Sequence, residues 1–253
     1  MKDNIRPIMK NKGFGAFLFF VGILGFAVII MRVVFYEFEY DPVHYPVDYG
    51  RFNFFSYFTV QSNLYVAFYL LCMGLAIFGK EKAQKIAFNP LVRLTVTTYI
   101  LVTGAVYCGG IPIGMTPPLS WDNFQHIMLG SVQVFHHMIM PPFMLVLFLI
   151  PTTGEKIKLK QLPIVGIYPL VYSVLSIIRG AVFKSHFFVY PFYKPEFFWN
   201  MLLKGREMNS GAAYMLLVPM LFLGIGVFLL LALILSLIYN RICEKTAKKT
   251  VEI

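Results

Sequence analysis

Six stretches of the chain are long and apolar enough to cross a lipid bilayer, and no other feature constrains the fold as strongly. A spanning helix needs about 20 mostly apolar residues, because its backbone must satisfy its own polar groups in hydrocarbon. The expected spans cover about residues 14–35, 54–78, 91–108, 121–150, 162–182 and 212–239. The sequence therefore predicts an all-α polytopic membrane protein, a bundle of six transmembrane helices that forms a single domain over residues 1–253.

The composition excludes a soluble globular domain. Hydrophobic residues make up 58% of the chain and charged residues only 13%, whereas soluble domains carry roughly 25% charged residues. The net charge of +10 alone would fit nucleic-acid binding. Most Lys and Arg residues, however, lie in the short segments between spans and in the two tails, where anionic lipid headgroups are the nearest partner. We therefore expect a membrane partner and no nucleic acid.

The distribution of charge also predicts an orientation. Basic residues gather in the N-terminal tail, the segments 79–90 and 152–160, and the C-terminal tail. The first loop of the opposite side instead carries Glu37, Glu39, Asp41 and Asp48. Because basic loops stay on the cytoplasmic side of membranes, both termini are expected in the cytoplasm.

The cysteines and histidines do not form a metal or haem motif. Cys72, Cys108 and Cys243 are scattered along the chain, which fits neither a disulfide framework nor a zinc site. His126 and His137 lie about 16 Å apart along one helix, too far to share a metal ion. Opposed haem ligands would need histidines on separate spans, and the span histidines all belong to the fourth. We expect no metal and no cofactor.

A polar group interrupts the second expected span. Ser56, Thr59 and Asn63 are spaced i, i+3, i+7 and would share one helix face. A threonine in a spanning helix often bonds the carbonyl four residues earlier, and Ser or Asn often joins helices. The alternative is that Thr59 acts as a nucleophile, with Asn63 as the donor that stabilises a developing oxyanion.

The fourth span carries a second polar face, formed by His126, Gln133 and His137. Pro141 lacks an N–H group and leaves the His137 carbonyl without its helical partner, so we expect a local kink. His137 is either a buried imidazole bonded to a neighbouring hydroxyl or a general base.

In the fifth span, Tyr168, Tyr172, Ser176 and Arg179 recur about every four residues. Arg179 either snorkels to the headgroups or binds an anionic headgroup or a fatty-acid carboxylate. The loop that follows, about residues 183–211, is rich in aromatic residues, and Pro195 is a candidate start for a short interfacial helix. This loop is either an interfacial anchor or a lid above a pocket.

An ordered set of motifs resembles a known family. The set comprises Tyr57–Leu64, the His137…Pro141 spacing, Tyr168-Pro169 with Tyr172, Arg179-Gly180, and Tyr190-Pro191-Phe192. Together they resemble bacterial six-span membrane proteins related to the androgen-inducible membrane protein family, over about residues 15–235. Animal members hydrolyse fatty acid esters of hydroxy fatty acids with an intramembrane threonine and histidine. The resemblance implies that Thr59 and His137 occupy those positions, in a bacterial cell membrane.

The leading hypothesis is therefore an intramembrane hydrolase of lipid esters. Thr59 would attack the ester carbonyl and His137 would accept its proton, while Gln133, Tyr172 and Arg179 contact the substrate. No triad acid is present in the motifs, so another group would have to orient the imidazole. The alternative is a lipid-binding or transport protein without catalysis, and the lack of acidic residues in any span disfavours ion-coupled transport.

Overall fold

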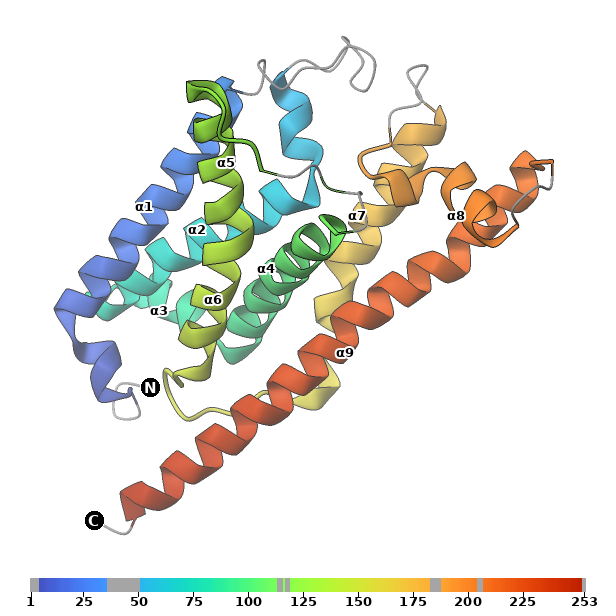
Figure 1. The fold of residues 1–253 in the computed structure, drawn as a ribbon. Helices are drawn as coiled ribbons and strands as arrows, with labels where there is room; N and C mark the ends of the chain where they lie inside the picture. The colour runs from blue at the N-terminus through green and yellow to red at the C-terminus, as the bar shows by residue number, and fades with distance from the viewer. Residues whose placement is uncertain are drawn as a thin grey trace.

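A computed structural model describes residues 5–35, 51–112, 116, 119–182, 188–203 and 207–251. Throughout this part of the chain the regular elements are helices (Figure 1). The α-helices are α1 (Lys12–Phe35), α2 (Phe58–Ile77), α3 (Glu81–Ala87), α4 (Pro90–Gly110), α5 (Phe124–Val134), α6 (Met140–Leu149), α7 (Pro163–Val182), α8 (Pro195–Leu202) and α9 (Ser210–Val251). Short 3-10 segments are η2 (Pro7–Lys10), η5 (Arg51–Ser56), η7 (Leu159–Gln161) and η8 (Pro191–Tyr193), and η6 (Phe135–Ile139) is a π-helical turn between α5 and α6.

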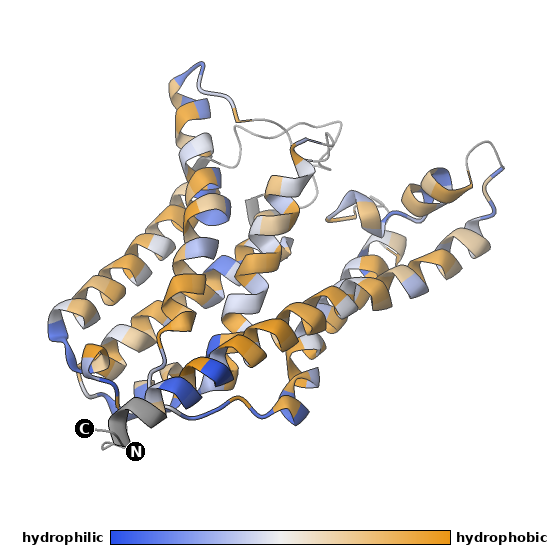
Figure 2. Cartoon of the chain, turned by 60° about the horizontal axis from the view of Figure 1, so that its bottom comes forward, coloured by the Kyte–Doolittle hydropathy of each residue, from blue (hydrophilic) through white to orange (hydrophobic). Residues whose placement is uncertain are grey.

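The six predicted spans are confirmed as helices long and apolar enough to cross a membrane. They are α1, α2, α4, the continuous α5–η6–α6 rod, α7 and α9. Figure 2 shows hydrophobic residues along the lengths of these helices and hydrophilic residues concentrated near their ends. The chain is therefore an integral membrane protein built as an all-α bundle.

Two helix bounds differ from the expectation. α2 begins at Phe58 rather than near residue 54, because residues 51–56 form the 3-10 segment η5. Ser56 thus lies before α2 and does not share a helix face with Thr59, which corrects the expected i, i+3 relation. α9 continues past residue 239 to Val251, where its sequence is polar and no longer resembles a membrane span.

α1, α2 and α4 form the closely packed half of the bundle. Gly22 and Gly74 lie at the α1–α2 interface, where an added Cβ atom would come within 2.9 Å of the Ala67 carbonyl oxygen or 2.8 Å of the Gly15 carbonyl oxygen. Small residues of this kind let membrane helices approach closely and gain dispersion contacts. α4 in turn contacts α2, α6, α7 and α9, so it is the central helix of the bundle.

The start of α4 is fixed by its own sequence. Asn89 is the N-cap, and its side-chain oxygen accepts hydrogen bonds from the Leu91 and Val92 backbone N–H groups. Pro90 occupies the first helical position, where its missing N–H costs nothing. The break between α3 and α4 thus returns the chain into the membrane.

The basic segments gather at one end of the bundle, which we call the basic end. There the Arg6 N–H donates to the Thr152 carbonyl, Lys156 Nζ donates to Glu244 at 2.7 Å, and the Ile157 N–H donates to the Asn240 side chain. The start of α1 and the end of α9 both lie at this end (Figure 1). The acidic residues expected at the opposite, far end (Glu37 to Asp48) fall outside the described residues.

Candidate functional site

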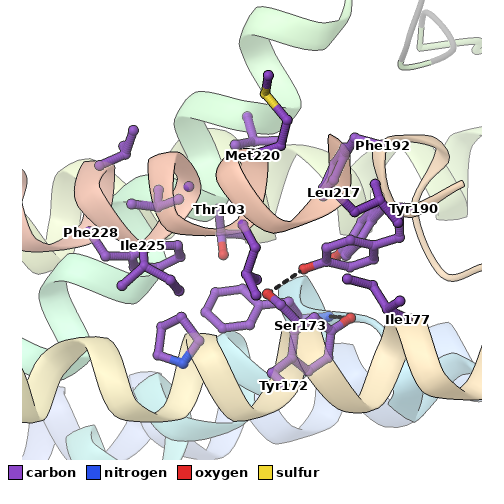
Figure 3. Close-up of a pocket in the computed structure, with 18 of the residues that line it drawn as sticks. Thr103, Tyr172, Ser173, Ile177, Tyr190, Phe192, Leu217, Met220, Ile225 and Phe228 are labelled. Carbon is purple, nitrogen blue, oxygen red and sulfur yellow. Dashed lines mark hydrogen bonds between the residues drawn. The ribbon is translucent and has the colours of Figure 1, made fainter. Parts of the chain in front are cut away.

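A cavity of about 230 Å³ lies between α4, α7 and α9, and the start of α2 and the η8–α8 segment close its remaining sides. Figure 3 shows α9 along one wall, with Leu217, Met220, Ile225 and Phe228, and α7 along the opposite wall, with Tyr172 and Ser173. Nearly all of the lining is aliphatic or aromatic, and none of the lining residues is charged. The chemistry of this site is therefore that of an apolar chain with a neutral polar group.

The polar lining of the cavity consists of hydroxyl groups: those of Thr59, Thr103, Tyr172, Ser173, Tyr190 and Tyr193. Ser173 and Tyr193 share a hydrogen bond of 2.8 Å, and Thr103 shares one of 2.8 Å with Ser62. These bonds join the helices around the cavity to each other and fix the direction of its polar groups.

Two tyrosine hydroxyls satisfy the N-terminus of α2 inside the bundle. The Tyr172 hydroxyl donates to the Ser56 carbonyl at 2.8 Å and accepts from the Phe58 N–H at 3.0 Å. The Tyr190 hydroxyl accepts from the Thr59 N–H at 3.2 Å. The first N–H groups of a helix have no partner within the helix, so these phenols take the place of a side-chain cap. Burial raises the pKa of Tyr190 above its usual value and that of Tyr193 to about 12, which keeps both phenols neutral.

Of the six residues proposed from sequence, Thr59 and Tyr172 line this cavity. Arg179 lines a second hollow beside α7, which Tyr172 also borders. Neither hollow has Asn63, Gln133 or His137 in its lining. Asn63 is buried and donates from Nδ2 to the Thr59 carbonyl at 2.8 Å, so it holds the first turn of α2.

His137 lies in the π-helical turn η6, on the side of α4 that faces away from the cavity. Its ring stacks on Tyr107 with centroids 3.9 Å apart and planes at 3°, and its carbonyl accepts a weak bond from Cys108 Sγ at 3.8 Å. α4 directs Val102, Thr103 and Val106 to the cavity. The structure therefore does not bring Thr59 and His137 into one cavity.

The distortion expected before Pro141 is present as this π-helical turn. The Met140 N–H donates to the Phe135 carbonyl five residues earlier, and Pro141 and Pro142 supply no N–H groups for the carbonyls of the turn. His136 and His137 are both buried, and His136 Nε2 and His137 Nδ1 have no hydrogen-bond partner among the described residues. Gln133 lies one turn earlier, partly exposed, in α5.

The aromatic loop supplies site residues that the sequence did not identify as such. Tyr190, Phe192, Tyr193 and Phe198 all line the cavity, and the short helix expected at Pro195 is present as α8. The Tyr-Pro-Phe-Tyr run from Tyr190 to Tyr193 is the sequence feature that could have indicated these lining residues, but such a run fits an interfacial anchor equally well. Residues 183–187 and 204–206 of this loop lie outside the described chain.

Within the described ranges, no three His, Cys, Asp or Glu residues lie close enough together to hold a metal ion. Comparison of the chain with protein-family models, with curated proteins and with solved structures found no match. The geometry of the cavity is therefore the basis for a functional conclusion, and the resemblance to the androgen-inducible membrane protein family stays an expectation.

Proposed function

We propose that this protein binds a lipid acyl chain in the cavity between α4, α7 and α9, with the polar group of the lipid beside Thr59, Tyr172 and Tyr190. The observation that supports this most directly is the separation of an apolar wall, supplied mainly by α9, from a cluster of hydroxyl groups on α2, α7 and η8. Ligand sites of this type are mostly apolar with a few placed polar groups that fix orientation.

The size of the cavity limits what it holds. Its volume of about 230 Å³ lies just below the roughly 300–1,000 Å³ of ordinary small-molecule pockets. A section of one acyl chain fits that space, whereas a whole phospholipid does not. The ligand is therefore a single chain or one arm of a branched lipid.

The charge of the lining favours a neutral polar group. An unpaired carboxylate buried among these residues would have no cationic partner in the lining, and that is costly in a dry site. An ester or hydroxyl group can instead accept and donate hydrogen bonds with the ring of hydroxyls. We accordingly assign an ester-bearing or hydroxyl-bearing acyl chain, and on the positive-inside rule we place the basic end in the cytoplasm.

Two glycines on α9 provide a matched test of binding. Gly224 lines the cavity and Gly226 does not, and at both positions an added Cβ atom meets nothing within 4 Å. Gly224→Leu should place a side chain in the space of the acyl chain without disturbing the fold. Displacing two or three methylene groups at about 0.8 kcal/mol each predicts a loss of affinity of roughly 15- to 60-fold.

The measurement is crosslinking of a photoreactive acyl ester to purified protein in detergent, followed by peptide mapping. The wild type and Gly226→Leu should be labelled at α9 and α7, and Gly224→Leu should be labelled weakly. Equal labelling of the three proteins, or labelling confined to the outer face of the bundle, would contradict binding in this cavity.

Ester hydrolysis is a second candidate function, and the position of Thr59 at the polar end of the cavity favours it. Thr59 Oγ1 would attack the ester carbonyl carbon as its proton passes to His137, and the collapsing intermediate would release the alcohol, which takes that proton back. Water would then hydrolyse the acyl-threonine and return the enzyme to its starting state. This route requires η6 and α4 to rearrange so that the imidazole reaches the cavity, and a π-helical turn is a common site of such local change.

Release of free fatty acid from a fatty acid ester of a hydroxy fatty acid tests the second candidate. Thr59→Ala and His137→Ala should each abolish release, whereas Thr95→Ala should not. Thr95 is a suitable control because its hydroxyl bonds the Leu91 carbonyl in its own helix and lines neither hollow. Release that survives in both site variants, with acyl-chain binding intact, would leave binding as the function.

A further inference from the structure

The walls of the cavity between α4, α7 and α9 are joined to each other on the α7 side. The Tyr99 hydroxyl donates to the Val165 carbonyl at 2.8 Å, which ties α4 to α7. Gly166 lets α9 lie close to α7, because an added Cβ atom would come within 3.2 Å of Ile225 and Leu229. α7 is therefore held against both of the helices with which it encloses the cavity.

Hydrogen bonds also close the cavity toward the far end and toward the second hollow. The Tyr193 hydroxyl shares a bond of 2.8 Å with Ser173, which fastens η8 to α7. The Tyr190 hydroxyl accepts from the Thr59 N–H at 3.2 Å, which fastens the same segment to α2. The Tyr172 ring borders both hollows, and two backbone groups at the start of α2 hold its hydroxyl at 2.8 and 3.0 Å. A lipid chain would have to break these bonds to enter from either direction.

The wall between α4 and α9 is different. These helices meet toward the basic end, where the ring centroids of Tyr99 and Phe228 lie 5.9 Å apart. Toward the far end, Val106 of α4 and Gly224 and Val227 of α9 line the cavity and are exposed, whereas every other described lining residue is buried or partly buried. Val106 is 51% exposed and Val227 is 52% exposed. Residues that line a cavity and are half exposed mark a place where the cavity reaches the outside of the bundle, and we call this opening the lateral mouth.

The lateral mouth is apolar and lies below the level of the headgroups. Its three residues carry no polar side-chain atoms, and an added Cβ atom at Gly224 would meet nothing within 4 Å, so α9 leaves a gap there. Val106 lies four residues before the end of α4 at Gly110, or about 6 Å along the helix. The mouth therefore faces the acyl chains of the bilayer. An acyl chain can pass through it without meeting water, whereas the transfer of a charged headgroup along this path is costly.

We propose that the ligand is a neutral lipid of the bilayer leaflet at the far end, and that it enters the cavity sideways through the lateral mouth. Its acyl chain passes between Val106 and Val227, and its polar group remains toward the far end, beside Thr59 and Tyr190. This inference rests on the proposed binding of an acyl chain and adds the source of the ligand. A membrane-resident ester or long-chain alcohol fits this route, whereas a water-soluble substrate does not.

Exchange of a bound probe tests the route. Protein in liposomes is loaded with the methyl ester of a diazirine-labelled fatty acid, an excess of the unlabelled ester is added, and samples are irradiated at intervals. Labelling of α9 and α7 peptides before the addition measures occupancy of the cavity, and its decay measures exchange. Val227→Trp places a ring in the mouth and should slow exchange about tenfold, because each passing chain must displace the ring. Occupancy before the addition should stay near that of the wild type.

Leu230→Trp is the matched control on α9. Leu230 is 59% exposed and does not line the cavity, so exchange in this variant should equal that of the wild type. On α4, Val106→Trp should slow exchange, whereas Ala105→Trp, at an exposed neighbour outside the lining, should not. The midpoint of thermal unfolding should be alike in the four variants.

The outcomes separate the route from the function. Exchange at the wild-type rate in Val227→Trp and Val106→Trp, with the cavity occupied, would overturn lateral entry and leave acyl-chain binding in place. Equal slowing in the two control variants would also overturn it, since the effect would then be unrelated to the mouth. A wild type without labelling of α9 and α7 would contradict the proposed function itself, and lateral entry with it.

Discussion

The α1–α2 interface and the α9 wall of the cavity use glycine in opposite ways. At the α1–α2 interface, Gly22 and Gly74 leave no room for even a Cβ atom, whereas Gly224 and Gly226 of α9 have open space around them. Burial also differs between α2 and α9: 67% of the most apolar stretch of α2 is buried, against 17% in α9. The first half is held by close helix packing, and the second encloses a cavity. The cavity therefore lies where α9 presents Gly224, which has open space around it.

Replacing Gly74 should give the largest effect on stability. Gly74→Leu would force the side chain against the Gly15 carbonyl and the Phe19 backbone, and overpacking of this kind costs about 3 kcal/mol or more. We expect the midpoint of thermal unfolding in detergent to fall by about 10 °C. Gly224→Leu on the cavity side should change it little, and equal losses in the two variants would contradict the division into halves.

Replacing Arg93 should have the next largest effect on stability, because this residue joins α4 to the end of α6 and to α9 at the basic end. Its Nη2 group donates to the carbonyls of Leu147 and Ile150 at 2.8 and 2.7 Å, and its Cζ lies 5.7 Å from the centre of the Tyr239 ring. Arg93→Leu removes the donor of the Ile150 carbonyl, whereas the Leu147 carbonyl keeps the Ile150 N–H, and we expect a cost of about 2 kcal/mol. The midpoint of thermal unfolding should fall by about 5 °C. Arg241 is exposed, and Arg241→Leu should leave the midpoint unchanged. An unchanged midpoint in Arg93→Leu would show that these bonds add nothing to stability.

On the cavity side, Tyr190→Phe should have a smaller effect. The variant removes the hydroxyl that accepts from the Thr59 N–H, and a neutral hydrogen bond contributes about 1 kcal/mol. Hydrogen exchange at the Thr59 amide should accelerate about fivefold, with little change at the amides in the middle of α2. Tyr214→Phe, at an exposed position of α9, is the control. Unaltered exchange at Thr59 would mean that the phenol does not hold the start of α2.

The fold was more predictable from sequence than the site, for physical reasons. The spans follow from hydropathy, because hydrocarbon forces each crossing to be a long apolar helix. The end of α9 was missed because residues 240–251 continue the helix with polar residues that carry no such signal. The start of α2 was placed too early because Phe54 and Phe55, near the end of the 3-10 segment η5, extend the apolar pattern of the helix that follows.

The site depends on which faces of different helices pack against each other. Periodicity within one helix does not predict that pairing. Thr59 and Tyr172 stood out as polar residues in apolar spans, and both border the cavity. The membrane-spanning part of α9 is apolar on all its faces, so its sequence does not indicate that Met220 and Phe228 face the cavity. His137 also stood out, but the order of the spans does not reveal that α4 lies between it and the cavity.

The last and smallest expected effect separates the two proposed functions of the cavity. No lining residue is acidic or basic, and burial keeps the pKa of Tyr190 raised and that of Tyr193 at about 12. Nothing in the cavity titrates near neutrality, so acyl-chain binding should be constant between about pH 6 and about pH 9. Hydrolysis with a histidine base would add turnover to binding, since a neutral imidazole can accept the Thr59 proton. Flat binding with no turnover supports a binding protein, and flat binding with turnover that His137→Ala abolishes supports the hydrolase. Binding that itself changes with pH would show that a charged group outside the described lining reaches the ligand.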